Sequence, residues 1–362
     1  MHYERDNIHR MHGYQWGEQP KDAGTIKLNT NENPYPPAPD VRAALGRFDV
    51  DVLRTYPQPT ADGLRDRLAA LHGVSREQLI ITHGGDEALR LAITTFVDPG
   101  AGFGMADPSY SLYPVLSEIQ DARSVSVPLD PHWQLPGDFA ARLNAAGVRL
   151  TCIVNPHAPS GTLLGRETLG TLAAELDGVL LIDEAYVDFV DPALGHDLAP
   201  LTRELDNVLL LRTFSKGYSL AGLRLGYLIG APSLIDPLIS KTRDSYNIDA
   251  VSQALGAAAI DARAYAADTW ARVRADRSTL HRALGQLGFS IPPSETNFLL
   301  ARVPTSARLS AAELQQALKT RGILVRHFAV PGLDDRLRIT IGTPEQNARL
   351  LDALTTLMTD SA

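Results

Sequence analysis

Beyond residue 60 the chain alternates short apolar runs with amphipathic stretches. Nearly continuous apolar runs, typical of strands that are covered on both faces, occupy 150–155, 178–183, 207–213 and 225–230. A shorter strand is predicted at 78–82, and helical periodicity is found at 86–97, 166–176 and 233–241. Strands that alternate with helices predict crossover connections, and therefore an α/β fold with a mostly parallel, doubly wound sheet.

The two ends of the chain have different patterns. Residues 1–40 are polar and rich in Pro, Gly and Asn, which predicts an extended N-terminal arm. A long helical stretch at 250–287 contains only Gly256 and Gly285 as weak points and is a candidate link between two domains. Strands at 297–301, 323–327 and 337–341 then alternate with helices at 311–321 and 344–358. We therefore predict an arm (1–40), a large domain (41–250) and a smaller α/β domain (251–362) that the long helix leads into.

Composition narrows the class of protein. The 362 residues carry a formal net charge of -8, and no Lys/Arg run is present, which argues against nucleic acid or anionic membranes as partners. No apolar run approaches the roughly 20 residues that a membrane-spanning helix needs. The first residues are charged and lack an apolar stretch of the signal-peptide type, so we expect a cytoplasmic protein. The single cysteine, Cys152, lies in an apolar run and is expected to be a buried core residue.

Lys216 is the most unusual polar residue of this pattern. It follows the apolar run 207–213 within a turn rich in Ser and Gly. A lysine in such a turn is usually a solvated surface cation. If it is shielded from water, its pKa falls and it becomes a nucleophile toward aldehydes, as Schiff-base formation requires. Ser215 and Arg224 are near enough in sequence to hold a phosphate beside that amine.

Polar residues also follow three other predicted strands. Asp183 ends the run 178–183, Tyr186 lies three residues later, and Asn155 ends the run 150–155. After the strand at 78–82, the turn with Gly84 and Gly85 leads into a helix whose N-terminus suits a phosphate. Each feature alone has an ordinary structural explanation, such as a helix cap or a tight turn. Together they predict a ligand site at the carboxyl edge of one sheet.

Two segments carry a resemblance to a known family. Residues 28–34 (LNTNENP) and 212–227 (RTFSKGYSLAGLRLGY) resemble the histidinol-phosphate aminotransferase branch of the fold-type I aminotransferases, which use pyridoxal 5'-phosphate (PLP). The resemblance extends from Leu28 through Gly342. It implies the aspartate-aminotransferase-like fold, with a large PLP-binding domain and a smaller C-terminal α/β domain. It also implies transamination between histidinol phosphate and 2-oxoglutarate in histidine biosynthesis.

The resemblance implies a role for each matching residue. Lys216 carries PLP as a Schiff base, Asp183 pairs with the ring nitrogen, and Tyr186 is the third catalytic residue. The ring and its hydroxyl would be contacted by Tyr110, Asn155 and Tyr186. The phosphate would be surrounded by Gly85, Asp86, Ser215, Arg224 and, from the neighbouring subunit of a homodimer, Tyr56. The substrate would be bound by Arg338, Arg326, Tyr14 and Asn33. Arginine suits anionic substrates because its guanidinium binds a carboxylate or phosphate in a bidentate fork. No metal is implied.

Several readings of the sequence remain open. Gly84-Gly85-Asp86-Glu87 stands where the family usually has Gly-Ser-Asp-Glu, so one phosphate hydroxyl is missing. Trp16 and Gln58 stand where the family commonly has Pro and Asp. The alternatives are an aromatic or other α-amino-acid aminotransferase, or a PLP-dependent decarboxylase of a phosphorylated amino acid. A nicotinamide-dependent dehydrogenase is disfavoured because no Gly-x-Gly-x-x-Gly turn is present. A non-catalytic regulator is disfavoured because both Lys216 and Asp183 are present.

Overall fold

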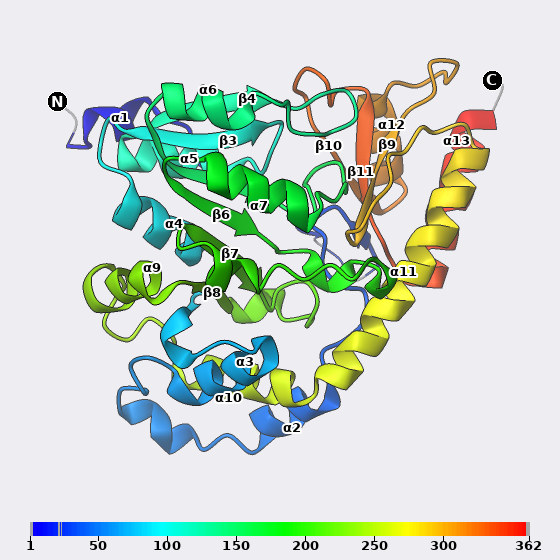
Figure 1. The fold of residues 1–362 in the computed structure, drawn as a ribbon. Coiled ribbons are helices and arrows are strands. Elements are labelled where there is room, and N and C mark those ends of the chain that lie inside the picture. The colour runs from blue at the N-terminus through cyan, green and yellow to red at the C-terminus, as the bar shows by residue number, and fades with distance from the viewer. Residues whose placement is uncertain (1–2, 21, 23, 360–362) are drawn as a thin grey trace.

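The computed structural model describes residues 3–20, 22 and 24–359, whose strands form two sheets. The larger has seven strands, in the order β2-β8-β7-β6-β5-β3-β4 (Figure 1). Its strands are β2 Leu79–Thr82, β3 Gly102–Asp107, β4 Arg123–Pro128, β5 Val148–Val154, β6 Val179–Asp183, β7 Val208–Thr213 and β8 Gly226–Gly230. Strand β8 runs opposite to the other six strands of this sheet. The predicted mostly parallel sheet is confirmed, although β3 and β4 were not predicted.

The larger sheet buries both of its faces. Along β7, Leu209 and Leu211 enter one hydrophobic core, whereas Val208 and Leu210 enter the other, because successive side chains of a strand point to opposite faces. Helices α4 Gly84–Phe96, α5 Leu112–Gln120 and α9 Pro232–Pro237 pack in the first core, and α6 Phe139–Ala145, α7 Arg166–Glu175 and α8 Leu201–Glu204 in the second. Cys152 is fully buried in the first core, as expected.

The smaller sheet has the strand order β1-β10-β11-β9. Its strands are β1 Ile26–Leu28, β9 Phe298–Arg302, β10 Ile323–His327 and β11 Arg336–Thr340. Strand β1 comes from the predicted arm and pairs in parallel with β10. It was not predicted, because three residues are too short for a periodic signal, yet Ile26 and Leu28 are both buried. The arm also contains the short helix α1 Asp6–Arg10 and leads into α2 Pro39–Gly46.

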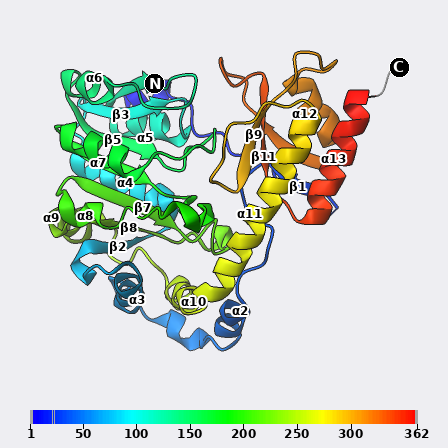
Figure 2. The same cartoon turned by 45° about the vertical axis from the view of Figure 1, so that its right-hand side comes forward.

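The helical stretch predicted at 250–287 is two helices. Helix α10 Ala250–Asp261 packs against α2 and α3 Asp62–His72, and α11 Arg263–Gln286 crosses to the smaller sheet (Figure 2). The break at Ala262 contains neither Gly nor Pro, so it could not be predicted from the residue types. The two helices follow different packing partners, which explains the change of direction. Helices α12 Ala311–Thr320 and α13 Pro344–Thr359 complete the C-terminal part.

The carboxyl ends of the parallel strands of the larger sheet point toward the smaller sheet (Figure 1). The fold therefore places the edge with the predicted polar residues beside strands β9 to β11.

None of the helices in the described ranges has the length and apolar character that crossing a bilayer requires.

Candidate active site

The ends of β5 and β6 fix two predicted residues beside each other. The main-chain N–H of Asn155 donates to the carbonyl of Asp183 at 2.9 Å, and both residues are buried. The Asn155 side chain also has local partners, because Leu164 N–H donates to its Oδ1 at 2.7 Å and its Nδ2 donates to Leu164 O at 3.2 Å. An amide nitrogen carries two hydrogens, so one N–H of Asn155 is left for a ligand.

Asp183 is a buried carboxylate without a cationic partner among the described residues. Its Oδ2 accepts a hydrogen bond from the Tyr113 hydroxyl at 3.0 Å, and its Oδ1 accepts one from Ala185 N–H at 3.1 Å. Burial raises the pKa of Asp183 to about 6, and these two hydrogen bonds only partly oppose that shift. A carboxylate in this setting is suited to a positively charged ligand group.

Lys216 lies in the turn after β7 and is half-buried. Its Nζ donates to the carbonyl of Thr30 at 2.9 Å. Burial lowers the pKa of Lys216 to about 8; the charge of Glu32 opposes this, and the nearby charges of Arg338 and Arg224 add to it. Lys216 is therefore partly shielded from water, and an amine with a lowered pKa is the form that a nucleophilic role would need.

Arg224 returns to the same edge because β8 runs antiparallel to β7 and begins there. One guanidinium nitrogen, Nη1, lies 3.5 Å from Ser215 Oγ, and Nη2 lies 3.1 Å from Asp86 Oδ2. A Cβ at Gly84, whose φ is +77°, would lie 2.8 Å from Arg224 Nη2. Glycine is thus needed where the first turn of α4 meets this guanidinium, and Gly85 follows in the same turn.

Three tyrosines close the site on the side of the smaller sheet. The Tyr186 hydroxyl accepts a hydrogen bond from Asn31 Nδ2 at 3.0 Å, and its ring meets Phe298 edge-on at 5.0 Å. Tyr110 follows β3 and meets the Tyr14 ring edge-on at 6.0 Å. Burial raises the pKa of both Tyr110 and Tyr186. The structure therefore brings Tyr14 from the arm next to Tyr110 and the end of β3.

Two predicted arginines face each other on adjacent strands. Arg326 of β10 and Arg338 of β11 are register partners, so their side chains lie on one face of the smaller sheet. Arg338 Nη2 donates to Asn29 O at 3.1 Å, and its Nε is buried without a hydrogen-bond partner among the described residues. Burial lowers the pKa of Arg338, and Tyr186, Tyr14 and Tyr110 lie close enough to oppose that shift. Both guanidinium groups also lie over the ring of Phe328, at 5.5 and 5.4 Å.

Two predicted residues are not brought into this group. Asn33 Nδ2 lies 3.3 Å from both Gly217 O and Thr269 Oγ1, and its Oδ1 accepts from Tyr35 N–H, so its amide fastens the arm to the Lys216 turn. Tyr56 is 80% exposed and stacks on Tyr246 at 4.5 Å. Within one chain, Tyr56 therefore faces solvent.

Four residues of the site were missed from the sequence. Tyr113 contacts Asp183 but follows β3, and this strand was not predicted. The sequence feature that could have indicated Tyr113 is its spacing from Tyr110, which places two tyrosines one helical turn apart after an Asp-Pro turn. Thr30, Asn31 and Glu32 lie in the segment that carried the family resemblance, but they were given no role.

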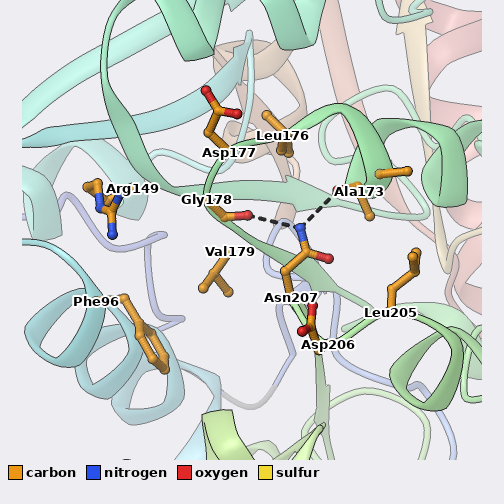
Figure 3. A pocket seen from close by; sticks show the side chains of 11 residues that line it. Phe96, Arg149, Ala173, Leu176, Asp177, Gly178, Val179, Leu205, Asp206 and Asn207 are labelled. Atoms are coloured by element: carbon orange, nitrogen blue, oxygen red, sulfur yellow. Dashed lines mark hydrogen bonds between the residues drawn. The ribbon is translucent and has the colours of Figure 1, made fainter.

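A hollow of about 550 Å³ lies at the opposite, amino edge of the larger sheet (Figure 3). It is lined by Phe96, Arg149, Gly178 and Asn207, among others, and Asn207 Nδ2 donates to the carbonyls of Ala173 and Gly178. None of the predicted site residues lines it. The described residues also contain no cluster of three or more His, Cys, Asp or Glu side chains suited to a metal ion.

The donor set at the carboxyl edge fits PLP. A buried acid without a cationic partner suits a protonated ring nitrogen, and a shielded lysine suits the aldehyde. The guanidinium of Arg224, the Ser215 hydroxyl and the glycine turn of α4 suit the phosphate, although Asp86 pairs with Arg224 and so competes for it.

Comparisons with known proteins agree with this fit. The family model described as aminotransferase class I and II matches residues 23–354. Histidinol-phosphate aminotransferase 1 of Trichormus variabilis is 44% identical over 357 residues, which cover 98% of this chain and 99% of that protein. The histidinol-phosphate aminotransferase of Synechocystis sp. is 39% identical, with 98% and 97% covered. A solved histidinol-phosphate aminotransferase from Sinorhizobium meliloti in complex with PLP has the same fold, with a TM-score of 0.84, 24% identity, and 92% of this chain and 90% of that chain covered.

The match spans nearly the whole chain and includes both sheets. Enzymes of this family use PLP as their cofactor, and the polar groups at the carboxyl edge of the larger sheet fit it. The chain belongs to the aminotransferase class I and II family and is a PLP-dependent aminotransferase.

Proposed function

We propose that this enzyme transfers the amino group of histidinol phosphate to 2-oxoglutarate, a step of histidine biosynthesis. The full-length identity of 44% to a histidinol-phosphate aminotransferase is the observation that carries the proposal. The pairing of Arg326 with Arg338 supports it, because each of the two substrates is an anion and guanidinium groups bind both phosphate and carboxylate.

We propose that the groups at the sheet edge hold the cofactor as follows. Lys216 Nζ binds it covalently, Asp183 holds a proton on the ring nitrogen, and Asn155 and Tyr186 donate to the ring hydroxyl. Tyr110 contacts the ring face. Arg224, Ser215 and the main chain at Gly85, with Asp86 positioning the Arg224 guanidinium, hold the phosphate. When bound, PLP withdraws electrons from the substrate carbon, and the side chains decide which bond breaks.

With PLP bound, Lys216 would have a second role. Its amine would take a proton from the substrate carbon and return it at a neighbouring atom. The lowered pKa, about 8, keeps a useful fraction of this amine unprotonated near neutral pH. Burial, which lowers that pKa, also keeps bulk water away from the proton being moved.

The substrate groups are assigned to the smaller sheet and the arm. Arg338 binds the carboxylate next to the reacting carbon of an amino acid such as glutamate. Arg326 and Tyr14 bind the far end of the substrate, which is a phosphate in histidinol phosphate. Asn33 acts indirectly, because its amide fastens the arm to the turn that carries Lys216.

A panel of amino donors tests the proposed reaction. Purified enzyme loaded with PLP is given histidinol phosphate, phenylalanine, tyrosine or threonine phosphate, each with 2-oxoglutarate, and glutamate formation is followed. Histidinol phosphate should give the highest kcat/KM. A preference for phenylalanine or tyrosine would instead favour an aromatic aminotransferase, and CO2 release without glutamate formation would favour a decarboxylase.

We also propose a homodimer with composite sites, working in the cytoplasm. Exposed apolar side chains gather in the segment that contains Val50, Leu53 and Tyr56, and Tyr246 stacks beside them. A patch of this kind is typical of an interaction surface. It is continuous with a hollow of about 390 Å³ lined by Tyr56 and by residues of α10. A second copy on this surface would bring Tyr56 to the phosphate of the neighbouring site.

A further inference from the structure

The loop between β4 and α6 contacts the smaller sheet through one aromatic ring. The guanidinium carbon of Arg336 lies 5.3 Å from the centre of the Trp133 ring, which is within the range of a cation–π interaction. Trp133 belongs to the larger sheet's side of the molecule, whereas Arg336 begins β11. Neither residue was a predicted site residue.

The backbone at Trp133 is in an unusual conformation. Its φ is +66°, in the left-handed region, which a bulky aromatic residue rarely adopts. A turn holds it there: Trp133 N–H donates to Asp130 O at 2.9 Å, and Asp130 Oδ1 accepts from the N–H groups of His132 and Gln134 at 2.8 Å each. Strain of this kind persists only where the surroundings enforce it, and it concentrates at functional sites. The turn thus fixes the direction of the ring.

The Trp133 ring also lies near a residue that is tied to the active site. The ring of His157 is 6.0 Å from it. His157 Nε2 lies 2.9 Å from the carbonyl of Pro108 and therefore donates to it, and Nδ1 lies 2.7 Å from Ser160 Oγ. Pro108 precedes Tyr110 by two residues. Trp133 therefore connects the segment that carries Tyr110 with the first residue of β11.

Arg336 and Arg338 lie on the same face of β11, because they are two residues apart in a strand and Leu337 between them is fully buried. The Arg336 guanidinium lies over the Trp133 ring and forms an ion pair with Asp335 at 3.2 Å, and its buried Nε has no hydrogen-bond partner among the described residues. The interaction with Trp133 therefore helps to hold this side chain.

A second link lies on the other side of Arg338. Thr340 Oγ1 donates to Asn31 Oδ1 at 3.0 Å, and Asn31 Nδ2 donates to the Tyr186 hydroxyl at 3.0 Å. Arg338 thus lies between two connections from β11 to the larger sheet. One runs through hydrogen bonds to Tyr186, and the other runs through Arg336 to Trp133.

We propose that Trp133 is a positioning residue for the substrate: by holding Arg336, it fixes where Arg338 lies relative to the cofactor edge of the larger sheet. The inference rests on the proposed role of Arg338 as the carboxylate anchor. Trp133 touches neither cofactor nor substrate in this scheme. It should therefore affect the affinity for anionic substrates and leave the cofactor unchanged.

The test measures KM and kcat for glutamate and 2-oxoglutarate in the PLP-loaded enzyme. Trp133→Ala should raise both KM values about 3- to 10-fold, as expected for loss of a partly buried cation–π contact, while kcat and the visible absorption of the bound cofactor stay unchanged. Asp130→Ala, which keeps the ring but frees the turn, should shift KM in the same direction. His132→Ala, an exposed side chain in the same turn, is the matched control and should leave KM unchanged.

A double-mutant cycle with Arg336→Met decides whether Trp133 acts through Arg336. The double variant should raise KM no more than the larger single change does. The proposal is overturned if the effects of the two single changes on KM multiply in the double variant. It is also overturned if Trp133→Ala leaves KM unchanged while Arg338→Ala raises it. If Arg338→Ala itself leaves every KM unchanged, the assignment of the carboxylate anchor is wrong and the positioning role of Trp133 is wrong with it.

Discussion

The carboxyl edge of the larger sheet and the face of the smaller sheet that carries Arg326 and Arg338 both contribute groups to the candidate active site, but these groups are held differently. Asn155 and Asp183 are joined by a main-chain hydrogen bond of 2.9 Å, and the register of adjacent strands sets their spacing. On the smaller sheet, Arg326 has no side-chain hydrogen bond among the described residues, and Arg338 has one. Strand register therefore sets the spacing of Asn155 and Asp183 and also that of Arg326 and Arg338, but the two guanidinium groups have few side-chain hydrogen bonds to hold them.

This difference indicates where the specificity for substrates can change. Asn155 and Asp183, whose spacing is set by strand register, cannot move independently, so this part of the cofactor site is preserved when loops vary. Arginines held by a few side-chain contacts can be redirected by small changes in the arm or in the loop at Trp133. We expect substitutions on the larger sheet to affect catalysis with all substrates, and those on the smaller sheet to affect some substrates more than others.

The most severe test of the cofactor side is Lys216→Ala. Turnover should be abolished, because Lys216 is the residue proposed both to bind the cofactor covalently and to move the proton. PLP should still bind through Asp183 and the phosphate groups. Absorption spectra before and after borohydride measure both effects: the wild type should be yellow and trapped by reduction, and the variant should release its cofactor on dialysis. A colourless wild type that stays inactive after PLP is added would contradict the assignment.

Asp183→Asn should give the next largest loss. The variant cannot hold a proton on the ring nitrogen by charge, so kcat should fall at least about 10²- to 10³-fold, the scale seen when one charge-stabilising group is removed from a sheltered site. Steady-state kinetics with two different amino donors measure the loss, and both donors should be affected alike. Near wild-type kcat would mean that another group sets the ring electronics.

The lowered pKa of Lys216 predicts how cofactor loading depends on pH. The free amine is the nucleophile, and its fraction rises as pH increases through the pKa. With a pKa of about 8, roughly a tenth is free at pH 7, or about 300-fold more than for an ordinary lysine. The rate at which apoenzyme gains visible absorption with PLP should therefore rise with a midpoint near pH 8. A midpoint above pH 10 would show that Lys216 is solvated.

Arg326→Ala should separate substrates. Loss of a charge-assisted hydrogen bond costs about 1.5–3 kcal/mol, so kcat/KM for histidinol phosphate should fall roughly 10- to 150-fold. Neutral aromatic donors should be affected much less, because they carry no anion at that end. Arg338→Ala is the matched comparison and should weaken the amino acids that carry an α-carboxylate. Equal losses for every donor in Arg326→Ala would rule out a phosphate-binding role.

The smallest expected signal concerns the dimer. Dimers that combine one Lys216→Ala subunit with one Tyr56→Phe subunit should regain activity at one of their two sites. That site has Lys216 from one subunit and Tyr56 from the other. Activity above the sum of the separate variants, with the mass of a dimer in solution, would support composite sites. A fully active monomer at assay concentration would contradict them.

The sequence was informative where a residue's position follows from one strand. Asp183, Asn155 and Lys216 each follow a continuous apolar run, so their common edge could be predicted from the rule for parallel strands. It was less informative where contacts join distant segments. Strand β1 has only three residues and pairs with β10 almost 300 residues later, and Tyr113 reaches Asp183 across 70 positions. The strained turn at Trp133 has no local signature such as Gly or Asn at the left-handed position.

The burial of Cys152 gives this enzyme a practical advantage. It is the only cysteine of the chain, it has no exposed surface, and burial raises the pKa of its thiol. Thiol-reactive probes should leave the native fold unlabelled, because the thiolate is the reactive form. Cysteines could be introduced at exposed sites such as Leu194, on the side of the larger sheet, and Val330, between β10 and β11. Spin labels or fluorophores would then attach to these two cysteines and not to Cys152. The separation of the two sheets then becomes a distance that can be followed during turnover.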